Sequence, residues 1–338
     1  MYINRRLNFH LLIEYSWRFL LGLSIYSTLV VAICEYQDWE WMHIPYEILT
    51  IIGIAVAFYI GFKNNSAYDR MWEARKIWGA IVNSSRSWGI MVKDYITDQF
   101  SSEKLNRKEL HSIHKELIYR HIAWVYVLRR QLWKAQRWEH NAPRVTKYKK
   151  FLMGIFAPNT KEDEMLLFLD KEEVNFMLQR KNVAAQLISK QSSRLRELRQ
   201  RNLINDFYHV KMKDMLIDLY TQQGKCERIK NFPLPRQYAT SSYLFVFIFV
   251  SIMPFGLMTE FHKLGPHLIW FTVPFTVLVG WIFWVMELIG EYAANPFERM
   301  PFDIPMTSIS RTIEIDLREM LGETDLPPVI EPYKDILL

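Results

Sequence analysis

One stretch, residues 45–78, constrains this chain more than any other, because its character changes halfway along. Residues 48–62 are apolar and uncharged, whereas from Lys63 onward charged residues alternate with tryptophans. No proline or other helix stop separates the two halves. The pattern predicts one continuous helix that starts inside a membrane and emerges into water as an amphipathic helix.

Small side chains form one stripe along the apolar half. Gly53, Ala57 and Gly61 are spaced by four residues, so they share a helix face. In a bilayer such a stripe allows two helix backbones to approach closely. A bulkier row is turned away from it and contains Thr50, Ile51, Ile54, Phe58 and Phe62.

The bulky row has two interpretations. In the first, Ile54 and Phe58 face an aqueous axis as an apolar constriction, which gates a pore by dewetting. The outer position of that constriction falls on Thr50 or Ile51. In the second, the row faces lipid on an ordinary spanning helix.

Four apolar blocks are long enough to cross a bilayer, which requires about 20 mostly apolar residues. Between the second and the third, glycine and proline are scarce, and residues 105–138 carry apolar side chains at helical spacing. Another helix is expected over 172–204. The predicted fold is therefore an all-α membrane protein, with four transmembrane helices in two pairs and a long helical region between the pairs. The blocks are 17–34, 44–62, 241–258 and 267–289.

The distribution of Lys and Arg orients these spans. Positive charges precede the first span and follow the second and fourth, whereas the link after the first span carries Glu35, Asp38 and Glu40 but no Lys or Arg. Since positive loops stay inside, both termini and the central region are predicted to be cytoplasmic. The expected division is an N-terminal cytoplasmic segment (1–15), transmembrane helices 1 and 2 (16–63), a helical cytoplasmic region (64–236), transmembrane helices 3 and 4 (237–290) and a cytoplasmic tail (291–338).

Catalytic motifs are few. His111, His114 and Glu116 form a weak metal-ligand pattern, so a membrane-bound metal oxidoreductase using the two histidines is one alternative. A solvated helix face is the other interpretation of the same residues. The sequence has no HExxH, no glycine-rich phosphate loop and no G-x-S-x-G motif. We therefore expect neither an enzyme nor a bound cofactor or metal.

The net charge of +6 is modest, and no nucleic-acid motif accompanies it, so no nucleic-acid partner is expected. Two acids near the end of the fourth span, Glu287 and Glu291, lie four residues apart on one face. Ionisable residues at such a depth are functional candidates. The alternative is an interfacial pair that reaches water or pairs with Arg299.

The segments SAYDRMWEARKIWG, PLPRQY and GEYAANPFE resemble the bestrophin family of ion channels, specifically its bacterial branch. The resemblance covers essentially the whole chain, and its specific parts are the Asn295-Pro296-Phe297 motif after the fourth span and the helix that runs from an apolar span into a Trp/Glu/Arg segment. It implies a homopentamer in the inner (plasma) membrane that passes small monovalent ions through one pore. It also implies that Ile54 and Phe58 lie in an apolar neck and that Val183 forms a cytoplasmic aperture.

Two properties of the family need adjustment for this chain. Animal members carry an acidic run after the NPF motif that binds calcium, but here only Glu298 and Asp303 occupy that segment, so no calcium activation is expected. The family is known for chloride, whereas the acidic outer link favours cations in this chain if it rims the entrance. Besides a channel and an oxidoreductase, a non-conducting membrane scaffold remains an alternative.

Overall fold

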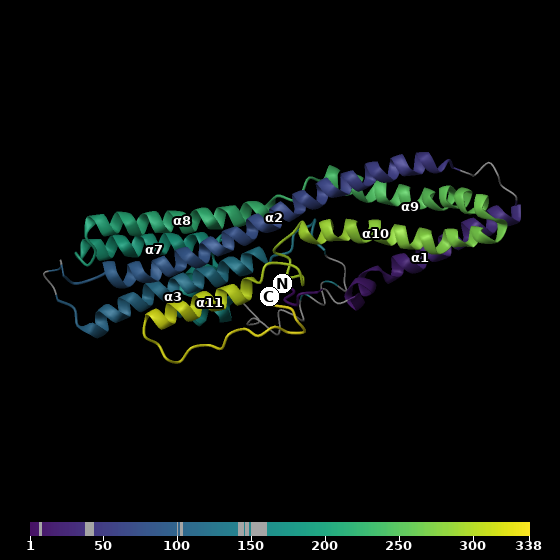
Figure 1. Cartoon of the computed structure of the whole chain (residues 1–338). Coiled ribbons are helices and arrows are strands. Elements are labelled where there is room, and N and C mark those ends of the chain that lie inside the picture. Colours follow the sequence, from purple (N-terminus) through teal and green to yellow (C-terminus); the bar gives the residue numbers. More distant parts are fainter. Residues whose placement is uncertain are drawn as a thin grey trace. The chain divides into compact units, whose positions relative to one another are not determined.

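The computed structural model describes residues 1–6, 9–37, 44–99, 101, 104–140, 145, 149 and 161–338. Its regular structure is helical, with isolated bridges joining Ile336 to Tyr2 and to Tyr333. The chain divides into two compact units (Figure 1). Unit 1 comprises Met1–Ile3, Trp72–Phe232 and Pro296–Leu338, and unit 2 comprises Asn4–Met71 and Pro233–Asn295.

Unit 2 is built from apolar helices. It contains α1 (Phe9–Gln37), the first part of α2 (Tyr46–Tyr95), α9 (Arg236–Leu264), the 3-10 helix η2 (Pro266–Phe271) and α10 (Thr272–Ala293). Four segments among the described residues are long and apolar enough to span a membrane, as the sequence predicts. They are Leu12–Gln37, Tyr46–Tyr95, Arg236–Leu264 and His267–Ala293.

Close helix contacts hold unit 2 together. A small core joins α1, α2 and α9, with Leu23, Val56 and Phe249 among its buried side chains. A Cβ atom on Gly53 would lie 3.0 Å from the Phe249 ring, so this glycine lets α9 approach α2. The small-residue stripe does not continue in this way, because a Cβ on Gly61 would meet no atom within 4 Å.

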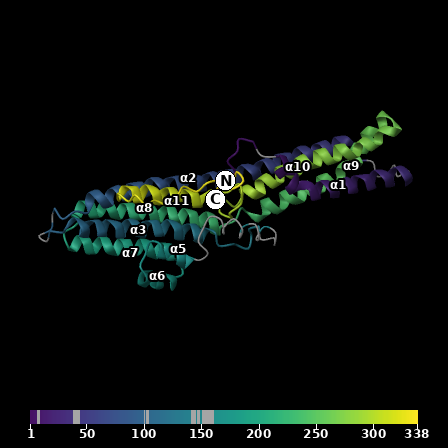
Figure 2. The ribbon, with the colours of Figure 1, turned by 90° about the horizontal axis from the view of Figure 1, so that it is seen from below.

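Unit 1 is a bundle of long helices around one core (Figure 2). Its largest fully buried side chains include Trp78, Trp88 and Trp124. Its elements are the rest of α2, α3 (Arg107–Leu132), α5 (Lys161–Leu166), α6 (Lys171–Leu178), α7 (Val183–Gln200), α8 (Asp206–Asn231) and α11 (Met306–Met320).

Asparagine caps set several helix starts in unit 1. Asn106 and Glu109 form a reciprocal capping box at the start of α3, with Asn106 Oδ1 accepting from the Glu109 N–H at 2.8 Å. The single helix expected over 172–204 is wrong, because the chain breaks between α6 and α7. There the Asn182 side chain accepts from the Ala185 N–H at 3.1 Å and starts a new helix.

Candidate pore-lining face and buried charge network

One face of α2 in unit 2 is exposed along its whole apolar part. The exposed fractions are 68% for Ile51, 66% for Ile54 and 68% for Phe58, and Thr50 is exposed as well. Phe62 extends the row, with its ring centroid 4.5 Å from that of Phe58 in an edge-to-face contact. The structure therefore places all four predicted neck residues on one exposed face of one helix.

The opposite face of α2 is buried within unit 2. Leu49, Val56 and Ile60 are at most 5% exposed and belong to the core shared with α9. The helix is thus oriented by its packing, and the row of Ile54 and Phe58 is what this packing leaves uncovered. The neck itself stays a prediction, since it depends on what this row faces.

The acidic link after α1, which the sequence predicts to lie outside, is only partly described, since Asp38 and Glu40 fall outside the described residues. Of the other two acids near it, Glu35 at the end of α1 and Glu47 at the start of α2 are exposed. On the neighbouring α9, Lys263 Nζ pairs with Glu260 Oε1 at 2.7 Å across an exposed surface.

A buried ion pair lies directly after the exposed row. Lys63, which follows Phe62, is 1% exposed, and its ammonium group pairs with the Glu287 carboxylate of α10. Glu291 Oε2 is a second partner, 3.5 Å from Lys63 Nζ. The alternative in which these acids pair with Arg299 stays a prediction.

Lys63 is the functional candidate that the sequence did not reveal. Its position suited a positive charge at the cytoplasmic end of a span, where long side chains reach water. Its partner Glu287 is 224 residues away, so no local pattern connects the two. The one sequence signal for this ion pair was the spacing of Glu287 and Glu291, which puts both acids on one face of the fourth span.

The NPF motif joins the two units in the chain, with Asn295 in unit 2 and Pro296 and Phe297 in unit 1. Phe297 is 1% exposed and lies in the core of unit 1. The Pro296 carbonyl accepts from the Ile304 N–H at 3.3 Å, which closes the loop before α11.

The two acids after the motif make different contacts. Glu298 Oε2 accepts from Lys149 Nζ at 2.9 Å and contacts His140 Nδ1 at 3.0 Å. Burial raises the pKa of Glu298, but His140 and Lys149 outweigh it and lower the pKa to about 2. Asp303 accepts from the backbone N–H groups of Glu298 and Met300, and burial raises its pKa to about 7.

This arrangement does not suit calcium, which prefers six to eight oxygen ligands. The Glu298 carboxylate already has a buried ammonium group as its counter-charge, and Asp303 faces backbone donors. The expectation that calcium does not activate this chain stays a prediction.

Val183 is the first residue of α7 and is fully buried in the core of unit 1. Its role as a cytoplasmic aperture stays a prediction, and the burial of its side chain does not favour it. The sequence could place Val183 before a long helix but could not tell which way its side chain points.

The histidine pattern on α3 is used for packing. His114 Nε2 lies 3.0 Å from the Ile96 carbonyl, and burial lowers the pKa of His114. His121 Nε2 lies 2.9 Å from Ser85 Oγ, and burial lowers its pKa to about 3. No group of three or more His, Cys, Asp or Glu side chains within the described ranges is arranged to hold a metal ion.

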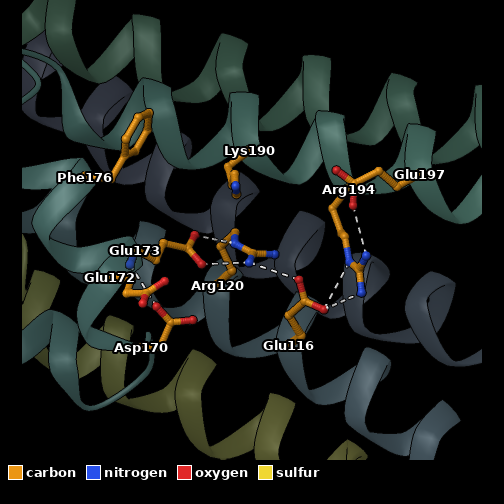
Figure 3. A pocket seen from close by; sticks show the side chains of 9 residues that line it. All are labelled: Glu116, Arg120, Asp170, Glu172, Glu173, Phe176, Lys190, Arg194 and Glu197. Atoms are coloured by element: carbon orange, nitrogen blue, oxygen red, sulfur yellow. Dashed lines mark hydrogen bonds and ion pairs between the residues drawn. The ribbon is translucent and has the colours of Figure 1, made fainter.

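Glu116, the acid of that pattern, lines a charged pocket of about 380 Å³ between α3, α6 and α7 (Figure 3). Arg194 Nη2 donates to Glu116 Oε2 at 2.9 Å. Arg120 donates twice to Glu173, at 2.6 and 2.8 Å. These bonds commit Glu116 to a network of ion pairs between helices, so the pattern is only partly solvated: His111 is exposed, whereas His114 and Glu116 contact neighbouring elements.

The fold and the sequence together define a multi-pass membrane protein with four candidate spanning helices in one unit and a helical bundle in the other. The bacterial/fungal bestrophin family profile matches residues 16–319, and the chain belongs to this family.

Two curated relatives each share 27% identity with the chain. The voltage-dependent anion channel-forming protein YneE of Escherichia coli (strain K12) aligns over 84% of this chain and 79% of its own length. The voltage-dependent anion channel-forming protein RSc3414 of Ralstonia nicotianae aligns over 85% of this chain and 82% of its own length. These names describe channel-forming proteins and not enzymes, in agreement with the lack of catalytic motifs in the sequence.

Solved structures share the fold. A crystal structure of a bacterial bestrophin homolog from Klebsiella pneumoniae superposes with a TM-score of 0.73 at 21% identity. The match covers 90% of this chain and 97% of that chain. The resemblance to bacterial bestrophins inferred from the sequence motifs is thus confirmed.

Proposed function

We propose that this chain is the subunit of a membrane channel that passes small monovalent ions. The observation that carries the proposal is the uncovered row of Ile54 and Phe58 on a helix whose other face is buried in unit 2. Such a row serves either as an apolar constriction, which gates conduction by dewetting, or as a lipid-facing surface, and the variants below distinguish the two. The channel-forming relatives support the same function.

The proposed assembly is a homopentamer whose α2 helices surround one axis. Each chain has a mass of 40.6 kDa, so light scattering of the detergent-solubilised protein, corrected for detergent, distinguishes five chains from two or four. In the proposed topology residues 1–15, 64–236 and 291–338 are cytoplasmic. Labelling of cysteines introduced into these segments, from either side of sealed vesicles, tests that orientation.

In the proposed neck, Ile54, Phe58 and Phe62 face the axis at successive turns, and Thr50 or Ile51 lies at the outer end. Water leaves a narrow apolar passage readily, so ions cross only when the passage widens. Truncating Ile54 and Phe58 to Ala should therefore raise the conductance.

The matched control for this test is the double variant Ile25→Ala/Leu29→Ala on α1. These residues are 54% and 55% exposed and four residues apart, as Ile54 and Phe58 are. The control should leave the conductance unchanged. Equal currents in the α2 and α1 variants would contradict the neck assignment.

Anions are the first candidate for the permeant ion, because the curated relatives are named as anion channel-forming proteins. Cations are the second candidate, favoured by exposed Glu35 and Glu47 at the outer ends of α1 and α2. Acidic residues at an entrance raise the local concentration of cations.

A reversal potential in a planar bilayer under a salt gradient decides between the two candidates. A potential near the chloride equilibrium value supports anion passage. A potential near the sodium or potassium value supports cation passage and a dominant acidic rim. Absence of current from correctly assembled protein contradicts the proposal and favours the membrane scaffold.

A further inference from the structure

The buried ion pair of Lys63 and Glu287 is the feature of unit 2 that the proposed conduction path does not itself use. The Lys63 side chain has no exposed surface, and that of Glu287 is 5% exposed. Charged groups inside an apolar environment are costly unless they are paired and hydrogen-bonded. A buried ion pair at this position therefore suggests a specific structural role for Lys63 and Glu287.

The pair connects three helices through one carboxylate. One oxygen of Glu287 on α10 accepts from Lys63 of α2, and the other accepts from the Ser242 hydroxyl of α9. Both oxygens of the buried carboxylate therefore have donors, and each donor comes from a different helix. In such a junction, one arrangement of the three helices forms all of these hydrogen bonds at once.

Helices α2 and α10 also approach each other closely beside this ion pair. Asn64 Nδ2 donates to the Met286 carbonyl of α10 at 2.9 Å. A Cβ atom on Gly290 would lie 2.0 Å from Asn64 Oδ1 and 3.5 Å from Lys63 Cε. The absence of a side chain at position 290 thus lets α10 come close enough for both interactions to form.

The geometry of the helix turns this junction into a constraint on rotation. At 3.6 residues per turn, Lys63 lies about 180° around α2 from Ile54 and about 140° from Phe58. If α2 turned about its axis, the ammonium group would leave both carboxylates while still inside the apolar unit. The ion pair therefore opposes rotation of the exposed row away from the direction it now faces.

We infer that Lys63 and Glu287 are positioning residues that fix the rotation of α2 and so hold the row of Ile54 and Phe58 in place. The inference rests on the proposed function only for the identity of that row as a neck. The orientation of the helix is a separate quantity and can be measured without any current.

The test removes both charges at once, in the variant Lys63→Met/Glu287→Met. No unpaired charge is then left buried, so the variant is expected to assemble. The remaining acid, Glu291, has a side chain that is 36% exposed and can reach water. The second variant is Glu287→Gln, which keeps the size of the side chain and a partner for Ser242.

The readout is a spin label on a cysteine introduced by Phe58→Cys or Ala57→Cys, with the buried Cys34 and Cys226 replaced by Ala. Accessibility of the label to oxygen and to a water-soluble nickel chelate is measured in lipid vesicles. In the variants the label at position 58 should lose accessibility by about twofold or more, and the label at position 57 should gain it. The charge-swapped variant Lys63→Glu/Glu287→Lys should restore both values.

The matched control is Lys263→Met/Glu260→Met, which removes an exposed ion pair of α9 in the same unit and should change neither label. Unchanged labels in either Lys63–Glu287 variant would overturn the inference. The proposed function fails separately: equal currents in Ile54→Ala/Phe58→Ala and in the α1 control Ile25→Ala/Leu29→Ala would show that the row is not a neck, whatever the labels report. In a conducting channel, the variants should also change the ratio of open to closed time on the order of tenfold.

Discussion

The two parts of α2 expose opposite kinds of side chain, although they belong to one uninterrupted helix of 50 residues. In unit 2 it exposes Ile51, Ile54 and Phe58, whereas in unit 1 it buries Trp78 and Trp88 completely. Both parts bury one apolar face, but the exposed face is rich in large apolar residues in unit 2 and mostly charged or polar in unit 1, as at Arg75, Arg86 and Lys93. The difference shows that surroundings, and not helix propensity, decide which face of this helix is covered.

The strongest test of this difference truncates a tryptophan of the inward-facing part. Trp88→Ala should destabilise unit 1 by about 3–5 kcal/mol, because it leaves a cavity in a closely packed core. Denaturant unfolding followed by tryptophan fluorescence measures the effect. Trp72→Ala, at a side chain 51% exposed on the same helix, should cost less than half as much. Equal losses would mean that the two tryptophans are covered to the same extent.

The stability of unit 1 should depend on pH, because burial raises the pKa of Asp303 in this unit to about 7. The folded state holds this proton at pH values where the unfolded state has released it. The free energy of unfolding therefore falls as the pH rises toward 7, and above pH 7 the contribution of this proton is gone. Between pH 5 and 8 the loss contributed by Asp303 should be about 2 kcal/mol, measured as the difference between the unmodified chain and Asp303→Asn.

The control for that titration is Asp303→Asn, which cannot ionise and should lack this contribution. Glu298 does not contribute in this window, since its pKa of about 2 lies below it and its contribution is lost only in acid. Parallel profiles for the unmodified chain and the variant would show that Asp303 is ionised in the folded protein throughout.

A single added methyl group at a close helix contact in unit 2 should have a smaller effect on stability than the changes above. Gly290→Ala should destabilise it by about 1–2 kcal/mol, because the added methyl group displaces Asn64 from its bond to the Met286 carbonyl. Thermal unfolding in detergent measures the shift. Gly22→Ala on α1, where a Cβ would meet no atom within 4 Å, should be neutral or slightly stabilising. A harmless Gly290→Ala would show that α10 does not approach α2 this closely.

The smallest expected effect is that of calcium on the current. Micromolar calcium should leave the conductance and the open-time fraction unchanged, since Lys149 already balances the Glu298 charge. The measurement compares calcium-buffered and chelator-containing solutions on the same membrane. A reproducible rise in current with calcium would contradict this expectation and point to oxygen ligands beyond Glu298 and Asp303.

Much of the fold follows from the sequence, because hydropathy and helical spacing are local properties. The four apolar blocks and the α3 helix were predictable for that reason. The break between α6 and α7 was not, since it depends on one asparagine that caps a helix instead of continuing it. Local signals at polar residues are weaker than those of apolar periodicity.

The candidate site was predictable only in part. The spacing of Ile54 and Phe58 on one face follows from helix geometry, and the structure places both on the exposed side. The partner of Glu287 and the direction of the Val183 side chain depend on residues far along the chain. No single-sequence pattern encodes such contacts, so these two points required the structure.

The continuity of α2 has a mechanical consequence. In unit 2 the helix runs from Tyr46 to Met71 without a proline, over about 39 Å at 1.5 Å per residue. A helix without such a break resists local bending. Any change in the diameter of a passage lined by this part of the helix is therefore to be sought in its axial rotation or in the rotamers of its side chains, and not in a kink.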